Sequence, residues 1–138
     1  MRVVADTNVL VSAFLWSGIP HKLLTAAEAG RVTLYTSPAI IDELVGVLSR
    51  DKFTARLHEL RVTPQELLMG YLKTARLVQP RDTPSIVKED PEDNMVLACA
   101  LTAGAEYLIT GDSHLLHVES YHTIQIVSPR TFFSRVLS

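Results

Sequence analysis

The N-terminal segment Arg2-Val3-Val4-Ala5-Asp6 is the feature that most restricts how this chain can fold. Its apolar, β-branched run indicates a strand buried on both faces, as the strands of a parallel sheet are. The run then ends in an acid. An ionised carboxylate at the edge of a core is costly unless hydrogen bonds, a base or a cation compensate for its lost hydration. Asp6 should therefore have partners, and they must come from elsewhere in the chain.

Strand and helix signals alternate along the rest of the sequence. We predict strands over 2–5, 32–35, 107–110 and 123–127, with a short strand at 77–78. Helices are predicted over 20–29, 38–48, 51–60 and 91–103, with two more beginning at Thr63-Pro64 and Ser128-Pro129. A capping residue followed by proline marks several of these helix starts. Because no Asn-Gly hairpin signal is present, the alternation predicts βαβ units and an α/β fold with a parallel sheet.

The composition limits the class of protein. A chain of 138 residues, 47% hydrophobic and 20% charged, predicts one folded domain over 1–138. The net charge of −2 argues against a broadly basic nucleic-acid-binding protein, although an acidic metal site could conceal a local basic patch. A single cysteine excludes an intramolecular disulfide, and the longest uncharged run, 7–20, is too short to span a bilayer. We expect a cytoplasmic protein without membrane association.

Acidic residues occur where a parallel sheet would bring them together. Ligands of such sheets bind outside the carboxyl ends of the strands. Asp6 and Asp112 each follow a predicted strand, and Asp93 lies in the first turn of the helix over 91–103. At 100° per residue, Glu43 borders the apolar face of the helix over 38–48, whereas Asp42 falls on the opposite side. The sequence therefore predicts that Asp6, Glu43, Asp93 and Asp112 share one edge.

Four converging carboxylates would raise one another's pKa values unless a cation lay between them. Carboxylate oxygens suit hard divalent cations, so the pattern predicts Mg²⁺ or Mn²⁺ as the cofactor. Such an ion polarises phosphoryl oxygens and lowers the pKa of an attacking water.

Each acid taken alone has a simpler explanation. Asp93 could complete a helix-capping arrangement with Asp90, and Asp112 could cap a short following helix. Glu43 could be a solvated helix residue. Asp6 has no such explanation, because it follows a buried run. The coincidence of all four acids on one predicted edge favours the metal site.

Polar neighbours of these acids could orient them by hydrogen bonding. Asn8, Ser37 and Thr110 are candidates for this supporting role, as is Asp90, although helix capping also accounts for Asp90. For Thr7 we favour ordinary turn and cap hydrogen bonding.

Other side chains are weaker candidates. His114 and His117 are three residues apart but lack further ligands for zinc, and we interpret them as surface histidines. Trp16 or Phe53 could stack on a base, yet each is better explained by packing. The same holds for the scattered basic residues that could contact phosphate, which are Arg31, Arg50, Lys52, Arg56, Arg81 and Lys88.

The motifs, in their order along the chain, resemble those of the PIN domain family, and specifically the small VapC-like toxin nucleases. The resemblance covers nearly the whole chain. It rests on Val4-Ala5-Asp6-Thr7-Asn8-Val9, on Ser37-Pro38 leading to Glu43-Leu44, on Glu89-Asp90-Pro91-Glu92-Asp93-Asn94, and on Thr110-Gly111-Asp112-Ser113-His114-Leu115-Leu116.

The resemblance implies a three-layer α/β/α fold with a central parallel sheet, in a single PIN-like nuclease domain. It implies a catalytic Mg²⁺ or Mn²⁺ site made by Asp6, Glu43, Asp93 and Asp112, and metal-dependent endonucleolytic hydrolysis of RNA. The implied partners are an RNA substrate, a cognate antitoxin of a toxin/antitoxin pair, and a second copy of the chain in a homodimer or higher homo-oligomer.

The sequence is compatible with two alternatives. The first is a catalytically silent PIN-like module that binds RNA or protein. The second is a Mg²⁺-dependent phosphotransfer domain of the haloacid-dehalogenase or receiver type, which also has an acid after its first strand. The sequence opposes the second, because Asp6-Thr7-Asn8 lacks a further acid two residues on and no lysine follows a late strand in the receiver position.

Overall fold

The computed structural model describes residues 1–81 and 91–137. These residues contain one sheet with the strand order β3-β2-β1-β4-β6-β5. Strand β1 lies in the middle of the sheet, where it pairs in parallel with both β2 and β4. The pairs β2–β3 and β4–β6 are also parallel. The strands are β1 (Arg2–Ala5), β2 (Thr33–Thr36), β3 (Arg76–Leu77), β4 (Tyr107–Ile109), β5 (Ser120–Tyr121) and β6 (Ile124–Val127).

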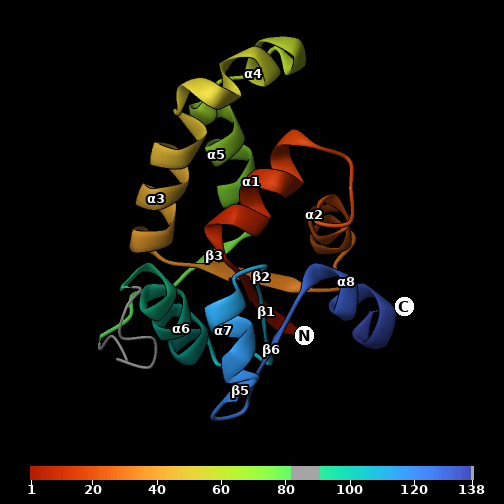
Figure 1. Ribbon diagram of the computed structural model, residues 1–138, viewed down its shortest axis with the longest axis vertical. Coiled ribbons are helices and arrows are strands. Elements are labelled where there is room, and N and C mark those ends of the chain that lie inside the picture. The colour runs from red at the N-terminus through yellow and green to blue at the C-terminus, as the bar shows by residue number, and fades with distance from the viewer. Residues whose placement is uncertain (82–90, 138) are drawn as a thin grey trace.

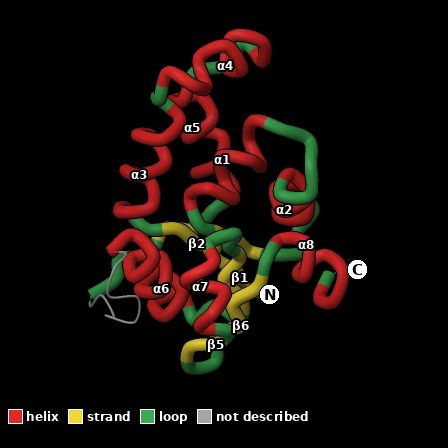
Figure 2. The backbone as a smooth tube through the Cα atoms, in the orientation of Figure 1, coloured by secondary structure: helices red, strands yellow, loops and turns green. Residues whose placement is uncertain are grey.

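Helices flank this mostly parallel sheet, so the predicted α/β fold is confirmed (Figures 1 and 2). Helix α6 packs against β1, β2 and β4, while α1 packs against α2 and α3. Helices α3, α4 and α5 extend to the end of the molecule opposite the β5 turn (Figure 1). The helices are α1 (Thr7–Leu15), α2 (His21–Glu28), α3 (Pro38–Leu48), α4 (Thr54–Leu60), α5 (Pro64–Thr74), α6 (Pro91–Ala103), α7 (Ser113–Val118) and α8 (Pro129–Thr131).

The local capping signals explain where these helices begin. Ser37 is the N-cap of α3 and Pro38 is its first residue, and Ser128 and Pro129 begin α8 in the same way. At the start of α5 the backbone N–H of Glu66 donates to the Thr63 hydroxyl at 3.1 Å, and the Thr63 N–H donates to the Glu66 carboxylate at 3.3 Å. This reciprocal capping box satisfies two backbone donors that the helix would otherwise leave unpaired.

Three details differ from the prediction. The apolar segment after Asp6, for which no helix is predicted, forms α1, because the Asp6 carboxylate caps it. The helix predicted over 51–60 begins as a 3₁₀ turn at Asp51–Phe53 before α4. A π-helical turn, Phe132–Val136, extends α8.

One edge of the sheet holds a strand that the sequence does not predict, β5, which pairs with β6 in an antiparallel hairpin. Residues 122 and 123 form its tight turn, in which His122 adopts a left-handed conformation with φ of 55°. Glycine and asparagine are the usual residues at such positions, but histidine is also enriched there. The sequence lacks the Asn-Gly signal of a hairpin because His122 supplies the left-handed residue of the turn.

The aromatic candidates for base stacking are used in packing. The rings of Trp16 and Phe53 meet edge to face, with centroids 6.0 Å apart. The Arg56 guanidinium lies over the Trp16 ring and donates from Nε to the Leu15 carbonyl oxygen at 2.7 Å. These contacts attach α4 to the C-terminal end of α1.

Helix length is relevant to membrane insertion. The longest helix in the described ranges is α6, with 13 residues, whereas a transmembrane helix needs roughly 20 apolar residues.

Helix α6 offers a matched test of the core, because it carries two leucines in different environments. Leu97 is fully buried and Leu101 is 36% exposed. We expect Leu97→Ala to lower the free energy of unfolding by about 2–5 kcal/mol, through lost burial and a residual cavity. Leu101→Ala should cost less than about 1 kcal/mol. Urea unfolding measures both, and equal losses would contradict the placement of α6.

Candidate metal centre

The carboxyl ends of the central strands lie level with one another, and this alignment creates the site. Ala5 pairs with Ile109, which in turn pairs with Val127. The Asp6 N–H therefore donates to the Ile109 carbonyl oxygen at 3.1 Å, and the Thr110 N–H donates to that of Val127 at 2.9 Å. The residues that follow β1 and β4 thus occupy one edge of the sheet, as the sequence predicts.

A small hollow opens at this edge, and its volume is about 60 Å³. That volume accommodates an ion with a few waters. Among the described residues, five carboxylates line the hollow and no lysine or arginine does. The lining residues are Asp6, Thr7, Asn8, Glu43, Glu92, Asp93, Val96 and Asp112. All four acids predicted from the sequence are therefore brought together.

Asp6 is the most constrained of these acids, with only 6% of its surface exposed. One carboxylate oxygen accepts a hydrogen bond from the Val9 N–H at 2.8 Å, which caps α1, and the other accepts from the Thr110 hydroxyl. Burial raises the pKa of Asp6, and the charge of Asp112 adds to the rise, while the Thr110 and Val9 hydrogen bonds lower it. The net direction is upward, so the ionised form lacks full compensation.

Glu43 projects from the second turn of α3 and is half-buried. Burial is the main cause that raises its pKa, the charge of Glu92 is the next, and Asp6 contributes further. The nearby Thr7 hydroxyl lowers it. Its neighbour Asp42 is exposed and does not line the hollow. The helical projection therefore separates these adjacent acids correctly.

Asp112 is the N-cap of α7, so part of its carboxylate is already used. Its Oδ1 atom accepts hydrogen bonds from the backbone N–H groups of His114 at 2.8 Å and Leu115 at 3.1 Å. Its own N–H donates to the Thr110 hydroxyl oxygen at 3.0 Å. The same hydroxyl donates to Asp6. Thr110 thus connects the acid after β1 to the acid after β4.

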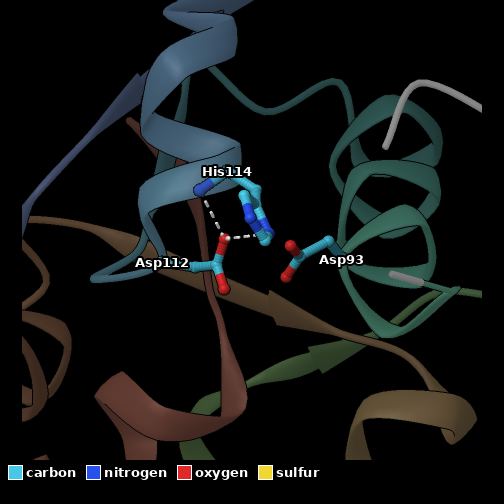
Figure 3. A group of neighbouring side chains, drawn as sticks. All are labelled: Asp93, Asp112 and His114. Carbon is cyan, nitrogen blue, oxygen red and sulfur yellow. Dashed lines mark hydrogen bonds and ion pairs between the residues drawn. The ribbon is translucent and has the colours of Figure 1, made fainter. Parts of the chain in front are cut away.

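Asp93, Asp112 and His114 form a group of potential metal ligands in the described part of the chain. One ligand atom from each lies within 4.8 Å of the others. Figure 3 shows the two carboxylates and the imidazole ring facing a common point, with Asp93 on α6 and the other two at the start of α7. Asp93 is 7% exposed and therefore lies on a packed face of α6.

The supporting residues divide into two groups. Asn8 lines the hollow, and Thr110 bonds two of its acids. Ser37 does not line the hollow; it is buried and accepts from the Ile40 N–H at 3.4 Å, as an N-cap of α3. Asp90 lies outside the described residues.

Three further residues lie at the site: Glu92, which the sequence does not single out, and Thr7 and His114, for which it favours other roles. Glu92 and Thr7 line the hollow, and each is the immediate neighbour of a predicted acid. His114 is exposed as expected, but its ring also faces Asp93 and Asp112. The Asp112 cap would have pointed to it, because an N-cap brings the backbone of the residue two positions later against the carboxylate.

The residues present fit a hard divalent cation. They supply several carboxylate oxygens in a hollow of ionic size, and two of the acids have pKa values raised by burial and mutual repulsion. A cation would relieve both effects.

The sequence matches the model of the PIN domain over residues 2–114, a stretch that contains all four predicted acids. The chain therefore belongs to the PIN domain family, in agreement with the motifs found in the sequence. No functionally curated protein is significantly similar to it in sequence.

Solved structures share the fold at low sequence identity. VapBC2 from Rickettsia felis, bound to a DNA fragment from its promoter, has a chain with a TM-score of 0.61 and 16% identity, covering 91% of this chain and 97% of that one. PAE2754 from Pyrobaculum aerophilum has a TM-score of 0.60 and 13% identity, and the match covers 99% of this chain and 90% of that one. FitAcB from Neisseria gonorrhoeae has a TM-score of 0.53 and 20% identity, and the match covers 93% of this chain and 98% of that one.

The raised pKa of Asp6 leads to a stability prediction. An acid whose pKa is higher in the folded than in the unfolded state destabilises the fold once the pH rises above the unfolded value. Asp6→Asn removes that charge and keeps an oxygen for the α1 cap. In EDTA at neutral pH, its melting temperature should exceed that of the native protein by about 2–6 °C.

The matched control is Asp42→Asn, on an exposed acid, which should leave the melting temperature unchanged. Addition of Mn²⁺ should stabilise the native protein and the Asp42→Asn control more than Asp6→Asn. A lower melting temperature for metal-free Asp6→Asn than for the native protein would contradict the conclusion that the Asp6 charge destabilises the fold.

Proposed function

We propose that this protein is a metal-dependent endoribonuclease that hydrolyses RNA phosphodiester bonds. The observation that carries the proposal is the hollow at the carboxyl edge of the sheet, which five carboxylates line and to which residues 1–81 and 91–137 contribute no basic side chain. Such an arrangement is unfavourable for an unassisted protein and suitable for a divalent cation that meets a phosphate.

Asp6, Glu43, Asp93 and Asp112 would hold the cation, which we propose to be Mg²⁺ or Mn²⁺. When bound, it would polarise a phosphoryl oxygen and lower the pKa of the attacking water. Without the cation, the negative charge of the carboxylates would repel an RNA phosphate from the hollow. The cation would therefore have to bind before the RNA.

Polar residues at or beside the hollow support these acids. The Thr110 hydroxyl donates to the Asp6 carboxylate and accepts from the Asp112 backbone N–H, while the cap of α7 orients the Asp112 carboxylate. Asn8 is exposed at the hollow, where its amide can donate to a phosphate or a sugar hydroxyl. The burial of Asp6 and Asp93 limits the access of bulk water to the acids.

The family and the shared fold support a more specific setting. PIN domains are typically nucleases, and the R. felis chain with this fold comes from a VapBC complex on promoter DNA. We propose by analogy that this protein is the toxin of a toxin/antitoxin pair. In that setting it would act in the cytoplasm, be restrained by a cognate antitoxin protein and form a homodimer or higher homo-oligomer.

Incubation of the purified protein with total RNA tests the activity. Cleavage should require Mg²⁺ or Mn²⁺, stop with EDTA and fall by at least about 100-fold in Asp6→Asn and Asp93→Asn. The adjacent acids of α3 supply a matched pair, since Glu43→Gln should lose activity and Asp42→Asn should retain it.

Robust cleavage by purified Asp6→Asn would refute the proposal. Tight binding of RNA without turnover across both metals would instead support a catalytically silent RNA-binding module. A covalent aspartyl phosphate on Asp6 would indicate phosphotransfer.

Thr110 gives a separate prediction about positioning. Thr110→Val removes the hydroxyl at nearly constant volume, so the Asp6 carboxylate loses a hydrogen-bond donor and the Asp112 backbone N–H loses its acceptor. Cleavage should fall by about tenfold or more, and Thr110→Ser should restore it because the hydroxyl returns. Equal activity of the valine and serine variants would show that the hydroxyl does not position the acids.

A further inference from the structure

We propose that His114 supplies a nitrogen ligand to the same cation as Asp93 and Asp112, and that this ligand makes the centre prefer Mn²⁺ to Mg²⁺. The inference rests on the metal site of the proposed function, but it concerns which ion is chosen rather than which substrate is cut. Its evidence is the position of the His114 ring.

The backbone at the start of α7 places this ring. Asp112 caps the helix through Oδ1, which accepts from the backbone N–H groups of His114 and Leu115. These two hydrogen bonds hold the histidine backbone directly against the Asp112 carboxylate. Both bonds use the same oxygen of Asp112, and Figure 3 shows the Asp112 and Asp93 carboxylates lying near each other beside the His114 ring.

The spacing of the three side chains suits a shared ion. His114 Nδ1 lies 3.9 Å from Asp112 Oδ1, and the potential ligand atoms of all three residues lie within 4.8 Å of one another. Ligand atoms about 2.1 Å from one ion are about 3–4 Å apart, so only small side-chain rotations are needed. The His114 side chain is 61% exposed, which leaves its ring free to make that adjustment.

The second histidine of α7 has a different environment. His117 lies one turn further along the helix, and its Nδ1 is 2.8 Å from the Ser113 carbonyl oxygen. It does not belong to the group formed by Asp93, Asp112 and His114. Only the first of the two histidines therefore faces the acids, and the second is a natural control.

A nitrogen ligand has a predictable effect on metal choice. Mg²⁺ prefers oxygen ligands and gives up its waters reluctantly. Imidazole is a softer ligand that suits transition metals better than Mg²⁺, and Mn²⁺ accepts it together with carboxylates. A purely carboxylate hollow would discriminate weakly between the two ions, whereas a centre that includes His114 should favour Mn²⁺.

Pulsed electron paramagnetic resonance on the full-length protein loaded with Mn²⁺ tests the ligand directly, without RNA. The native protein should show the ¹⁴N coupling of a directly bound imidazole. His117→Ala should retain this coupling, and both His114→Ala and His114→Gln should lose it. Absence of the coupling in the native protein, or its persistence in both His114 variants, would overturn the proposal.

Calorimetric titration with Mn²⁺ alone and with Mg²⁺ alone tests the preference. His114→Ala should weaken Mn²⁺ binding by about tenfold or more and change Mg²⁺ binding by less than about threefold. Equal weakening for both ions, or no change for either, would overturn the preference. Since neither experiment contains RNA, a nitrogen-bound Mn²⁺ in a protein that never cleaves RNA would refute the nuclease and leave this inference intact.

Discussion

The unfavourable burial of negative charge at the end of β1 is the constraint on which the rest of this structure depends. Asp6 must stay in place although burial raises its pKa, and two hydrogen bonds secure it, one from the Val9 N–H and one from the Thr110 hydroxyl. The first begins α1 and the second connects β1 to the end of β4. The same carboxylate therefore caps a helix, joins two strand ends and contributes charge to the hollow.

This organisation explains why the site needs the whole fold. The acids come from the ends of β1 and β4, from the second turn of α3 and from the first turn of α6. Parallel pairing on both sides of β1 aligns those ends, and the packing of α6 against β1, β2 and β4 brings Asp93 to the same edge. The buried carboxylates lower the free energy of unfolding, and a cation that binds them would raise it again. Metal binding and folding would therefore stabilise each other.

The sequence predicted much of this architecture, because strong local signals coincided with it. Ser37-Pro38 and Thr63-Pro64 mark helix starts by chemistry that acts within four residues, and the run before Asp6 marks a buried strand. What was missed depended on tertiary context. The β5–β6 hairpin turns through His122, whose left-handed backbone has no distinctive sequence signal. Glu92 and His114 are ordinary surface residues by pattern. The packing of α6 brings Glu92 to the hollow, and the position of α7 brings the His114 ring close to Asp93 and Asp112.

The central claim is that the acids at the carboxyl edge of the sheet form a single cation site. The most direct test is a crystal structure of the protein soaked in Mn²⁺, with an anomalous difference map collected at the manganese edge. We expect an anomalous peak inside the hollow, within ligand distance of Asp6, Asp93 or Asp112. An empty hollow at saturating Mn²⁺, or manganese bound only elsewhere on the surface, would contradict it.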